Sequence, residues 1–492
     1  MTAAALEAPA APQPRPLSSA SARLSWLRER GMGASVLVAA ISTAFGVVLI
    51  SATAFIGAML SADPYIGNSG TLGFVLSFMT VLLVGVAVYV ASIVTANTFA
   101  TVVAGRTHRI ALLRLIGASA RSQRSEIARQ GLGVGVIGAF LGLVGGTALA
   151  AGGVWLAGRM LGLDDVPFTL VRADLLLPAA IVALTTWAAA WAGSRRVLTV
   201  TPLQALGGSV EASHESVSRR SGRNITALVL FIIGGALLAL GVLAGLVSPL
   251  GVVIAFVGGI LSFTGLALGA TLVMPPVLRL VGRLFGRSAT ARLAAENALR
   301  YPERSSRMAI GVVMGVTLVT MFAVAIESTK AVMTASAGGE LPSELGAVLD
   351  SFAAIMMGLV AVSAVIAGVG LVNLLTLGVV QRRRELGLLR ALGVSNGQVR
   401  RMVLLEAAHI TIAATASGLV LGVVYGWAGP QSLLGSVPTN PDAPVTGTFV
   451  WPAVPLWPVV AIVVATAVLT LVAAVVPTRL ATRVAPVEAL AE

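Results

Sequence analysis

Long stretches without a charged side chain dominate this sequence. Nine of them lack Asp, Glu, Lys and Arg altogether, and they cover residues 33–62, 69–105, 131–158, 175–194, 224–278, 308–326, 351–380, 407–440 and 443–478. Most are longer than the roughly 20 residues that a helix needs to cross a bilayer. Only 11% of all residues are charged, whereas soluble domains carry about 25%. The chain is therefore predicted to be an all-α polytopic membrane protein.

The run at 224–278 is long enough for two helices. Ser248, Pro249 and Gly251 in its middle are typical turn residues, so we expect the chain to reverse there. Counting this run as two spans predicts ten transmembrane helices in all.

Basic residues orient these spans, because loops rich in Lys and Arg stay in the cytoplasm during insertion. Of the 33 Lys and Arg residues, only Arg159, Arg172 and Lys330 fall in loops on the outer side. The scheme predicts a multi-pass protein of the bacterial cell membrane with both termini in the cytoplasm. The net charge of +13 then reflects topology, and we expect no nucleic-acid partner because the basic residues are scattered over several loops without interleaved aromatic residues.

One short motif occurs twice, as LLRLIGAS at 112–119 and as LLRALGVS at 388–395. An offset of 276 residues superimposes the two copies, and it also places Asn97 on Asn373 and Arg124 on Arg400. Each copy lies between two apolar runs. The chain is therefore predicted to contain an internal duplication.

Each repeat accounts for four spans, and an even number of spans between the repeats keeps them in the same orientation. We expect two parallel four-helix repeats plus a central helix pair, with outer loops too short to form a large extracytoplasmic domain. The predicted segments are a disordered cytoplasmic tail at 1–22, the first repeat at 23–207, a cytoplasmic linker at 208–223, two connecting transmembrane helices at 224–278, a second cytoplasmic linker at 279–306, and the second repeat at 307–492.

Glycines recur every fourth residue in the third span of each repeat. They are Gly138, Gly142 and Gly146 in the first repeat and Gly418, Gly422 and Gly426 in the second. Glycines at this spacing share one helix face, where they allow another membrane helix to approach closely. The pattern fits a static packing face and a moving interface equally well.

The repeated LLR motif predicts a short charged helix, a turn at Gly117 or Gly393, and a second helix that leads back into the membrane. Ser395 and Gln398 fit a capping box at the start of that second helix. The first copy has Ser119 as the cap but Ser122 in place of the glutamine. The residues alone leave three roles open for this segment: docking into another protein, lying on the membrane surface, or simply connecting two spans.

The segment RELGLLRALG at 384–393, set between two spans and followed by a glycine-rich span and a terminal P-x-x-A-L, resembles the FtsX-like permease family of ABC transporters. The arrangement of four, two and four spans is similar to that of larger bacterial members, including bacitracin-efflux, lipoprotein-release and macrolide-export permeases. The first copy departs from the pattern by carrying Arg109 where the second carries Glu385.

This resemblance implies that the motif is the coupling helix that contacts an ATPase subunit. The residues to which the role is transferred are Leu113, Arg114, Gly117, Ser119, Leu389, Arg390, Gly393 and Ser395. It also implies a cytoplasmic P-loop ATPase as partner, in two copies for two motifs, with ATP and Mg bound on that partner.

The chain itself is not expected to be an enzyme, since it contains no G-x-x-x-x-G-K-[ST] loop and its one lysine is Lys330. It has no cysteine, and its three histidines lack metal-ligand spacing, so no metal site and no cofactor are predicted. We expect a permease subunit that exports or extracts a lipid-like or amphipathic substrate, in contact with membrane lipids. An ATP-driven regulator of a cell-wall hydrolase or sensor kinase is the main alternative. A secondary transporter is a lesser one, because the predicted spans have no ionisable group at their centres.

Overall fold

Long helices make up nearly all of the structure. The computed structural model describes residues 32–61, 119–161, 171–194, 221–283, 289–300, 302–336, 390–436 and 447–483, together with a few single residues between them. The helices in these ranges are α2 (Met32–Ser61), α5 (Ala120–Leu161), α6 (Leu176–Gly193), α10 (Ser221–Gly245), α11 (Gly251–Leu268), α12 (Ala270–Gly282), α13 (Ala289–Arg300), α14 (Pro302–Ser336), α17 (Asn396–Leu434) and α18 (Leu456–Arg483). The described residues form no strand.

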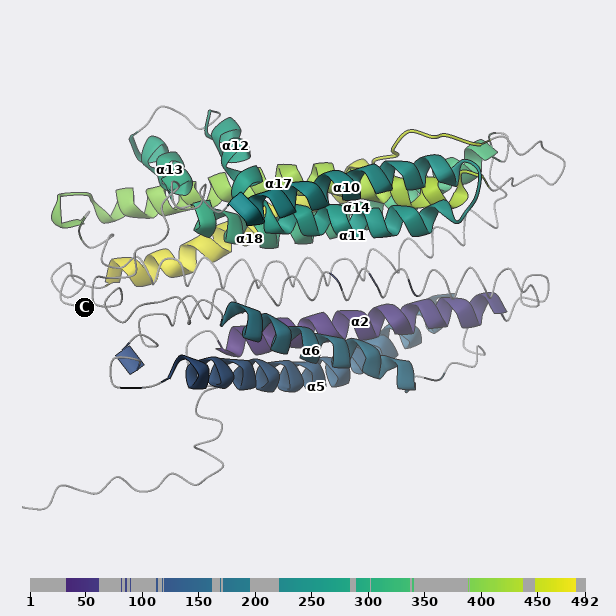
Figure 1. The fold of residues 1–492 in the computed structure, drawn as a ribbon, viewed down its shortest axis with the longest axis horizontal. Helices are drawn as coiled ribbons and strands as arrows, with labels where there is room; N and C mark the ends of the chain where they lie inside the picture. The colour runs from purple at the N-terminus through teal and green to yellow at the C-terminus, as the bar shows by residue number, and fades with distance from the viewer. Residues whose placement is uncertain are drawn as a thin grey trace, which may run out of the picture.

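Seven of the described helices are long and apolar enough to cross a membrane. They belong to α2, α5, α6, α10, α11, α14 and α17, and α18 adds a shorter apolar stretch at Leu456–Val472. These helices run along one common axis (Figure 1). The protein is thus an all-α polytopic membrane protein. The predicted spans at 69–105 and 351–380 lie largely or wholly outside the described residues, as do the tail at 1–22 and the linker at 208–223 apart from its last three residues.

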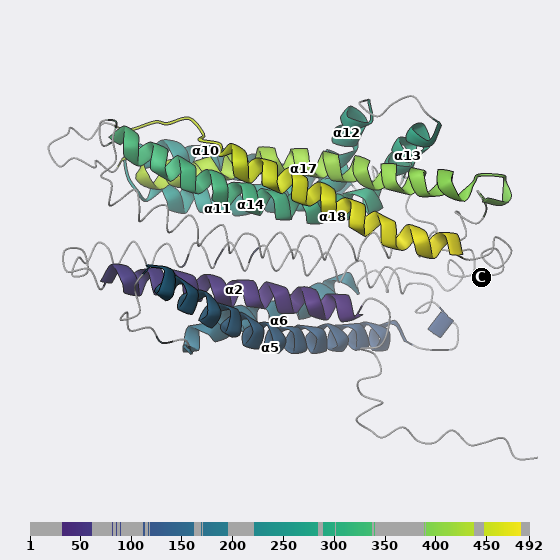
Figure 2. The same ribbon diagram turned by 180° about the vertical axis from the view of Figure 1, so that it is seen from behind.

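The helices form two bundles that lie side by side in both views (Figures 1 and 2). One contains α2, α5 and α6 of the first repeat. The other contains α14, α17 and α18 of the second repeat together with the inserted helices α10 and α11. Corresponding helices pack in the same way, because α5 lies along α2 as α17 lies along α14.

The inserted apolar run reverses where the sequence predicts it. α10 ends at Gly245, residues 246–250 form a turn, and α11 begins at Gly251. The far end differs from the sequence prediction, which carries the second span to Leu278. α11 ends at Leu268, Gly269 leaves the helical conformation with φ −89° and ψ 9°, and α12 begins at Ala270 as a separate helix.

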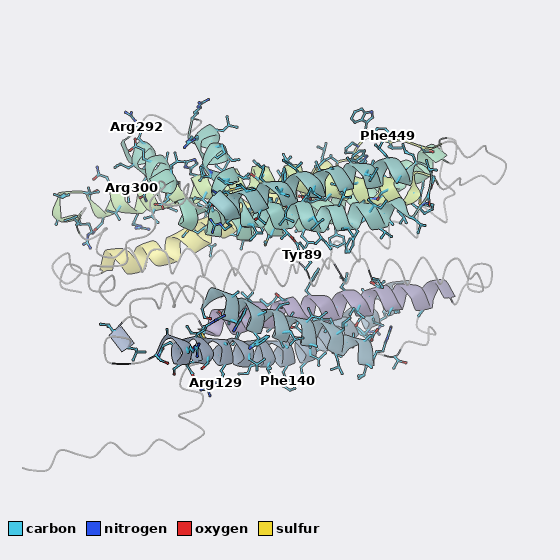
Figure 3. The ribbon with its side chains drawn as sticks, in the orientation of Figure 1. Tyr89, Arg129, Phe140, Arg292, Arg300 and Phe449 are labelled. Carbon is cyan, nitrogen blue, oxygen red and sulfur yellow. The ribbon has the colours of Figure 1, made fainter. Side chains whose placement is uncertain are left out.

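The main apolar core joins the two bundles. It includes Val38, Phe45 and Leu49 of α2 together with residues of α11, α12, α14 and α17. Tyr89, in the predicted second span of the first repeat, packs against this core, and its hydroxyl lies 2.7 Å from that of Thr264 on α11. Figure 3 shows Tyr89 beside the second bundle.

The repeated glycines lie in the contacts between α5 and α2 and between α17 and α14. A Cβ atom added to Gly142 would lie 2.2 Å from the carbonyl oxygen of Ala40 on α2, and one added to Gly422 would lie 2.4 Å from Cβ of Thr320 on α14. A Cβ added to Gly138 or Gly146 would lie 2.5 or 2.8 Å from the nearest atom of α2, and one added to Gly418 or Gly426 would lie 2.8 or 2.5 Å from the nearest atom of α14. Any larger side chain at these positions forces the paired helices apart.

We predict that Gly142→Ala lowers the free energy of unfolding by about 1–3 kcal/mol, because the added methyl group overpacks the contact between α5 and α2. Gly145→Ala is the matched control on the same helix, since nothing lies within 4 Å of a Cβ added there. Equilibrium unfolding of both variants in mixed detergent micelles measures the difference. Equal stability of the two variants would contradict the packing described here.

Candidate functional site

The two copies of the repeated motif form tight turns at the same end of the molecule, where α5 and α17 begin (Figure 1). Gly117 has φ 102° and Gly393 has φ 96°. Side chains other than glycine are strained in this left-handed region. The sequence prediction of a turn at each glycine is therefore matched by the backbone.

The turn at Gly393 is closed by hydrogen bonds on both sides. Before the turn, the backbone N–H of Leu392 donates to the carbonyl of Leu388, and that of Gly393 donates to the carbonyl of Arg390. After it, Ser395 and Gln398 form the predicted capping box: the N–H of Gln398 donates to Oγ of Ser395 over 3.2 Å, and the N–H of Ser395 donates to Oε1 of Gln398 over 2.9 Å. The second turn is thus fixed at the entry to α17.

The turn at Gly117 has only half of this cap, as its sequence predicts. The N–H of Ser122 donates to Oγ of Ser119 over 3.1 Å. The side chain of Ser122 is too short to reach the backbone N–H of Ser119 as a glutamine would. The described residues therefore lack the second bond of the capping box. Among the described residues, one side-chain bond caps the first turn and two cap the second.

Each turn stands at the tip of a helical extension. The uncharged runs of α5 and α17 begin at Gly131 and Ala407, whereas the helices begin at Ala120 and Asn396. Eleven helical residues therefore precede each apolar run, and at a rise of about 1.5 Å per residue they reach about 16 Å beyond it. We call residues 120–130 and 396–406 the two levers.

Apolar side chains are exposed beside both turns. Leu112 has 43% of its surface exposed, Leu388 has 52% and Leu392 has 74%. Leu113 and Arg390 are half-buried, whereas Gly117, Ser119, Gly393 and Ser395 are exposed. Arg114 and Leu389, which the sequence also selects, lie outside the described residues. Exposed leucines at a rigid turn offer an apolar contact surface.

The second lever is braced by the linker that precedes the second repeat. Ala294 of α13 packs with Val399, Met402 and Val403 of α17 in a small apolar cluster. Nδ2 of Asn297 donates to Oε2 of the buried Glu406 over 2.6 Å. One turn further along α17, Nε2 of His409 lies 2.6 Å from the carbonyl oxygen of Leu278 on α12.

The first lever has a different brace. The guanidinium of Arg124 lies 4.3 Å from the ring centre of Trp191, near the end of α6, and Ile127 packs with Met32 and Ala190. Neither brace is predictable from the sequence, because Asn297 and Glu406, like Arg124 and Trp191, are far apart along the chain. The related signal in the sequence is that two ionisable residues, Glu406 and His409, stand at the start of an apolar run.

The opposite end of the second bundle is closed by an extended segment at residues 447–455. The side-chain amide of the fully buried Gln431 donates to the carbonyl of Thr448 and accepts from the N–H of Val450. Nε1 of Trp427 donates to the carbonyl of Val450 over 2.6 Å. Trp427 is thus part of a hydrogen-bonded closure, whereas Trp155, at the equivalent end of α5, is 62% exposed with Arg159 over its ring.

The described residues contain no group of three or more His, Cys, Asp or Glu side chains that could hold a metal ion. What the described residues do show at the repeated motif is two glycine turns, two levers and two close helix pairs.

Two segments of the sequence, residues 81–202 and 357–486, match the FtsX-like permease C-terminal family, and together they make up about half of the chain. The chain belongs to the FtsX-like permease family. Each matched segment contains one glycine turn, one lever and one of the glycine-packed helices α5 and α17. The permease domain thus occurs twice.

Similar proteins are ABC transporter permeases. The macrolide export ATP-binding/permease protein MacB of Rhodopirellula baltica is 30% identical over 153 residues, which are 31% of this permease and 20% of MacB. The ABC transporter permease YtrF of Bacillus subtilis is 37% identical over 73 residues, 14% of this permease and 16% of YtrF. YknZ of the same organism, an uncharacterized ABC transporter permease, is 29% identical over 101 residues, 20% of this permease and 25% of YknZ. The chain spans a quarter or less of the length of each of these relatives.

Proposed function

We propose that this permease is the membrane subunit of an ABC transporter whose two glycine turns dock onto separate ATPase subunits. The observation that carries the proposal is the pair of levers of equal length, each with a rigid turn and exposed leucines at its tip. An ATPase that changes shape on binding ATP needs fixed contact sites on the permease. The two glycine turns provide two such sites at the same end of the molecule.

The distance of the turns from the apolar runs favours docking over the two other roles. Tips about 16 Å beyond the apolar run lie outside the hydrocarbon layer, so their leucines gain little from a membrane surface. A mere connector has no need of a capping box, a left-handed glycine and exposed leucines together. A protein groove that buries Leu388 and Leu392 accounts for all three features.

We infer a cytoplasmic P-loop ATPase partner in two copies per chain, with ATP and Mg bound on that partner. The chain has no P-loop sequence of its own, and MacB is named for both an ATP-binding and a permease part. In this proposal the permease is not an enzyme. Both of its termini and both turns lie on the cytoplasmic side of the cell membrane, where the positive-inside rule puts the basic residues.

The cargo that best fits is a lipid-like or amphipathic molecule, which the permease exports or extracts from the membrane. Several hydroxyls within the described helices are engaged with their own helix: those of Thr185, Thr264 and Thr466, for example, donate to carbonyls four residues earlier. Those of Ser42, Thr43, Thr317, Thr320 and Thr415 are buried without a hydrogen-bond partner among the described residues, and Thr43 and Thr320 lie against glycines of a neighbouring helix. A small hydrophilic solute requires polar groups along its path, whereas an amphiphile can enter sideways between apolar helices.

We predict that replacing Leu388 and Leu392 together by alanine weakens ATPase binding at least tenfold, because well-buried leucines at an interface contribute about 1–2 kcal/mol each. Native mass spectrometry of the tagged permease purified in mild detergent counts the bound ATPase copies. Leu240→Ala together with Leu243→Ala on α10 is the matched control, since these leucines are 52% and 60% exposed but lie within a span. ATPase binding by the Leu388→Ala/Leu392→Ala permease that is as tight as binding by the control would contradict the docking proposal.

A mechanical regulator is the second candidate function. In it, movement of the helices activates an external cell-wall hydrolase or informs a sensor kinase, without moving cargo. The firm closure of residues 447–455 by Gln431 and Trp427 provides an outer surface that such a partner could sense. A secondary transporter is a lesser alternative, and dependence on ATP rather than on an ion gradient separates it from both.

Reconstitution in liposomes distinguishes export from regulation. If the permease is an exporter, we expect amphiphiles to raise the ATPase rate of the complex and at least one of a panel of fluorescent lipids or lipopeptides to move only with ATP. The complex with the Leu388→Ala/Leu392→Ala permease should show neither effect. An ATPase rate that ignores every amphiphile, together with a hydrolase or kinase that co-purifies tightly, would instead support the regulator.

A further inference from the structure

The helices α12 and α13 form a hairpin whose exposed face has no role in the proposed docking. They project from the side of the second bundle, crosswise to its long helices and away from α2, α5 and α6 (Figures 1 and 2). We call residues 270–300 the lateral hairpin. The sequence had assigned its first part to a transmembrane span and the rest to a linker.

The lateral hairpin is fastened at the level where the apolar runs begin. The hydroxyl of Ser306 donates to the carbonyl of Ala270, and that of Ser305 donates to the carbonyl of Ala298. The two serines lie three and two residues before the uncharged run that starts at Met308 of α14. On the other side, His409 contacts the Leu278 carbonyl at the start of the uncharged run of α17. These bonds hold the hairpin at the boundary between hydrocarbon and water.

The exposed face of α12 changes character along its length. Met274, Leu278 and Val281 are buried against the core. The opposite face presents Leu272, Val273 and Pro276 first, and then Arg279, Leu280 and Arg283. Leu280 remains 63% exposed. A helix with apolar side chains and arginines on one outer face is typical of the membrane interface, where arginine stems lie in the hydrocarbon and their heads reach phosphates.

The charge of the hairpin is nearly all positive. Its described residues carry Arg279, Arg283, Arg292 and Arg300 and a single acidic residue, Glu296. Arg279, Arg283 and Arg292 are exposed, and Figure 3 shows Arg292 on the outer side of α13. An exposed Leu293, at 50%, lies next to it. This combination matches an anionic lipid surface in both its apolar and its charged parts.

We propose that the lateral hairpin binds anionic phospholipid headgroups of the cytoplasmic leaflet and so anchors the inserted linker, and with it the brace of the second lever, to the membrane. Lipid is favoured over the ATPase for α12, because its bonds to Ser306 and His409 hold this helix at the membrane boundary, about 16 Å from the tips of the levers. The proposal does not depend on the proposed transport function. The described residues of the first repeat contain no hairpin that corresponds to α12 and α13.

A single fluorescent label tests this directly, because the natural chain has no cysteine. Leu280→Cys carries a bimane probe, and the permease is reconstituted in equal parts of phosphatidylcholine and phosphatidylglycerol, with bromine on the acyl chains of one lipid at a time. We expect brominated phosphatidylglycerol to quench more strongly, corresponding to about fivefold enrichment for each arginine that reaches a headgroup. Arg279→Gln with Arg283→Gln should remove the preference but not the quenching. No ATPase or nucleotide is present.

Val424→Cys is the control, since this side chain is 42% exposed within the span of α17, and both lipids should quench a probe there equally. Leu293→Cys provides a second reporter if the Leu280 variant does not fold. Equal quenching by both lipids at Leu280 would overturn the anionic preference. Absence of quenching by either lipid would show that the hairpin is not a lipid surface. In a separate experiment with aqueous iodide as the quencher, protection of the probe that appears only after the ATPase is added would show the same.

Discussion

The close approach of α5 to α2 and of α17 to α14 is the constraint on which the rest of the structure depends. At Gly142 and Gly422 the backbones are so near that not even a methyl group fits without displacement. In a bilayer, where no hydrophobic force drives helices together, such close packing supplies the dispersion contacts that hold a pair. Each pair can therefore be regarded as one stiff unit that continues past the membrane boundary as a lever. In the proposed coupling, a force applied at Gly117 or Gly393 would reach the membrane through packed helices.

The two repeats pack their helices in the same way, but different contacts support their levers. Both levers have the same length, and both start from a serine cap. The second has a complete capping box and a brace from α13, through Ala294 and the bond between Asn297 and Glu406. The first has half a box and rests on Trp191 through Arg124. Two ATPase copies acting on this permease would meet supports of different stiffness.

The sequence predicts those parts of the molecule that depend on local chemistry. Gly393 and Gly117 are recognisable because a repeated glycine between two helices commonly marks a left-handed turn, and Ser395 with Gln398 because a capping box spans only four residues. The turn between α10 and α11 is marked by Ser248, Pro249 and Gly251. The end of α11 cannot be predicted from the sequence, because Leu272, Val273 and Met274 continue the apolar run past Gly269. Periodicity does not distinguish a span from an amphipathic helix of the same hydropathy. The contacts that brace the levers cannot be predicted for another reason. Asn297 on α13 and Glu406 on α17 meet only once the helices have packed.

The most direct test of this account is whether each lever and its span move as one body. Spin labels at Arg121→Cys and Gly397→Cys report on the distance between the levers, and labels at Gly153→Cys and Gly429→Cys report on the distance between the opposite ends of α5 and α17. The two label pairs occupy equivalent positions in the repeats, and nothing lies within 4 Å of a Cβ added at Gly153 or Gly429. We expect ATP and the ATPase partner to change both distances together, as measured by electron–electron double resonance. A change between the levers with no change at the opposite ends would show that the helices bend at the membrane boundary, and it would contradict the account.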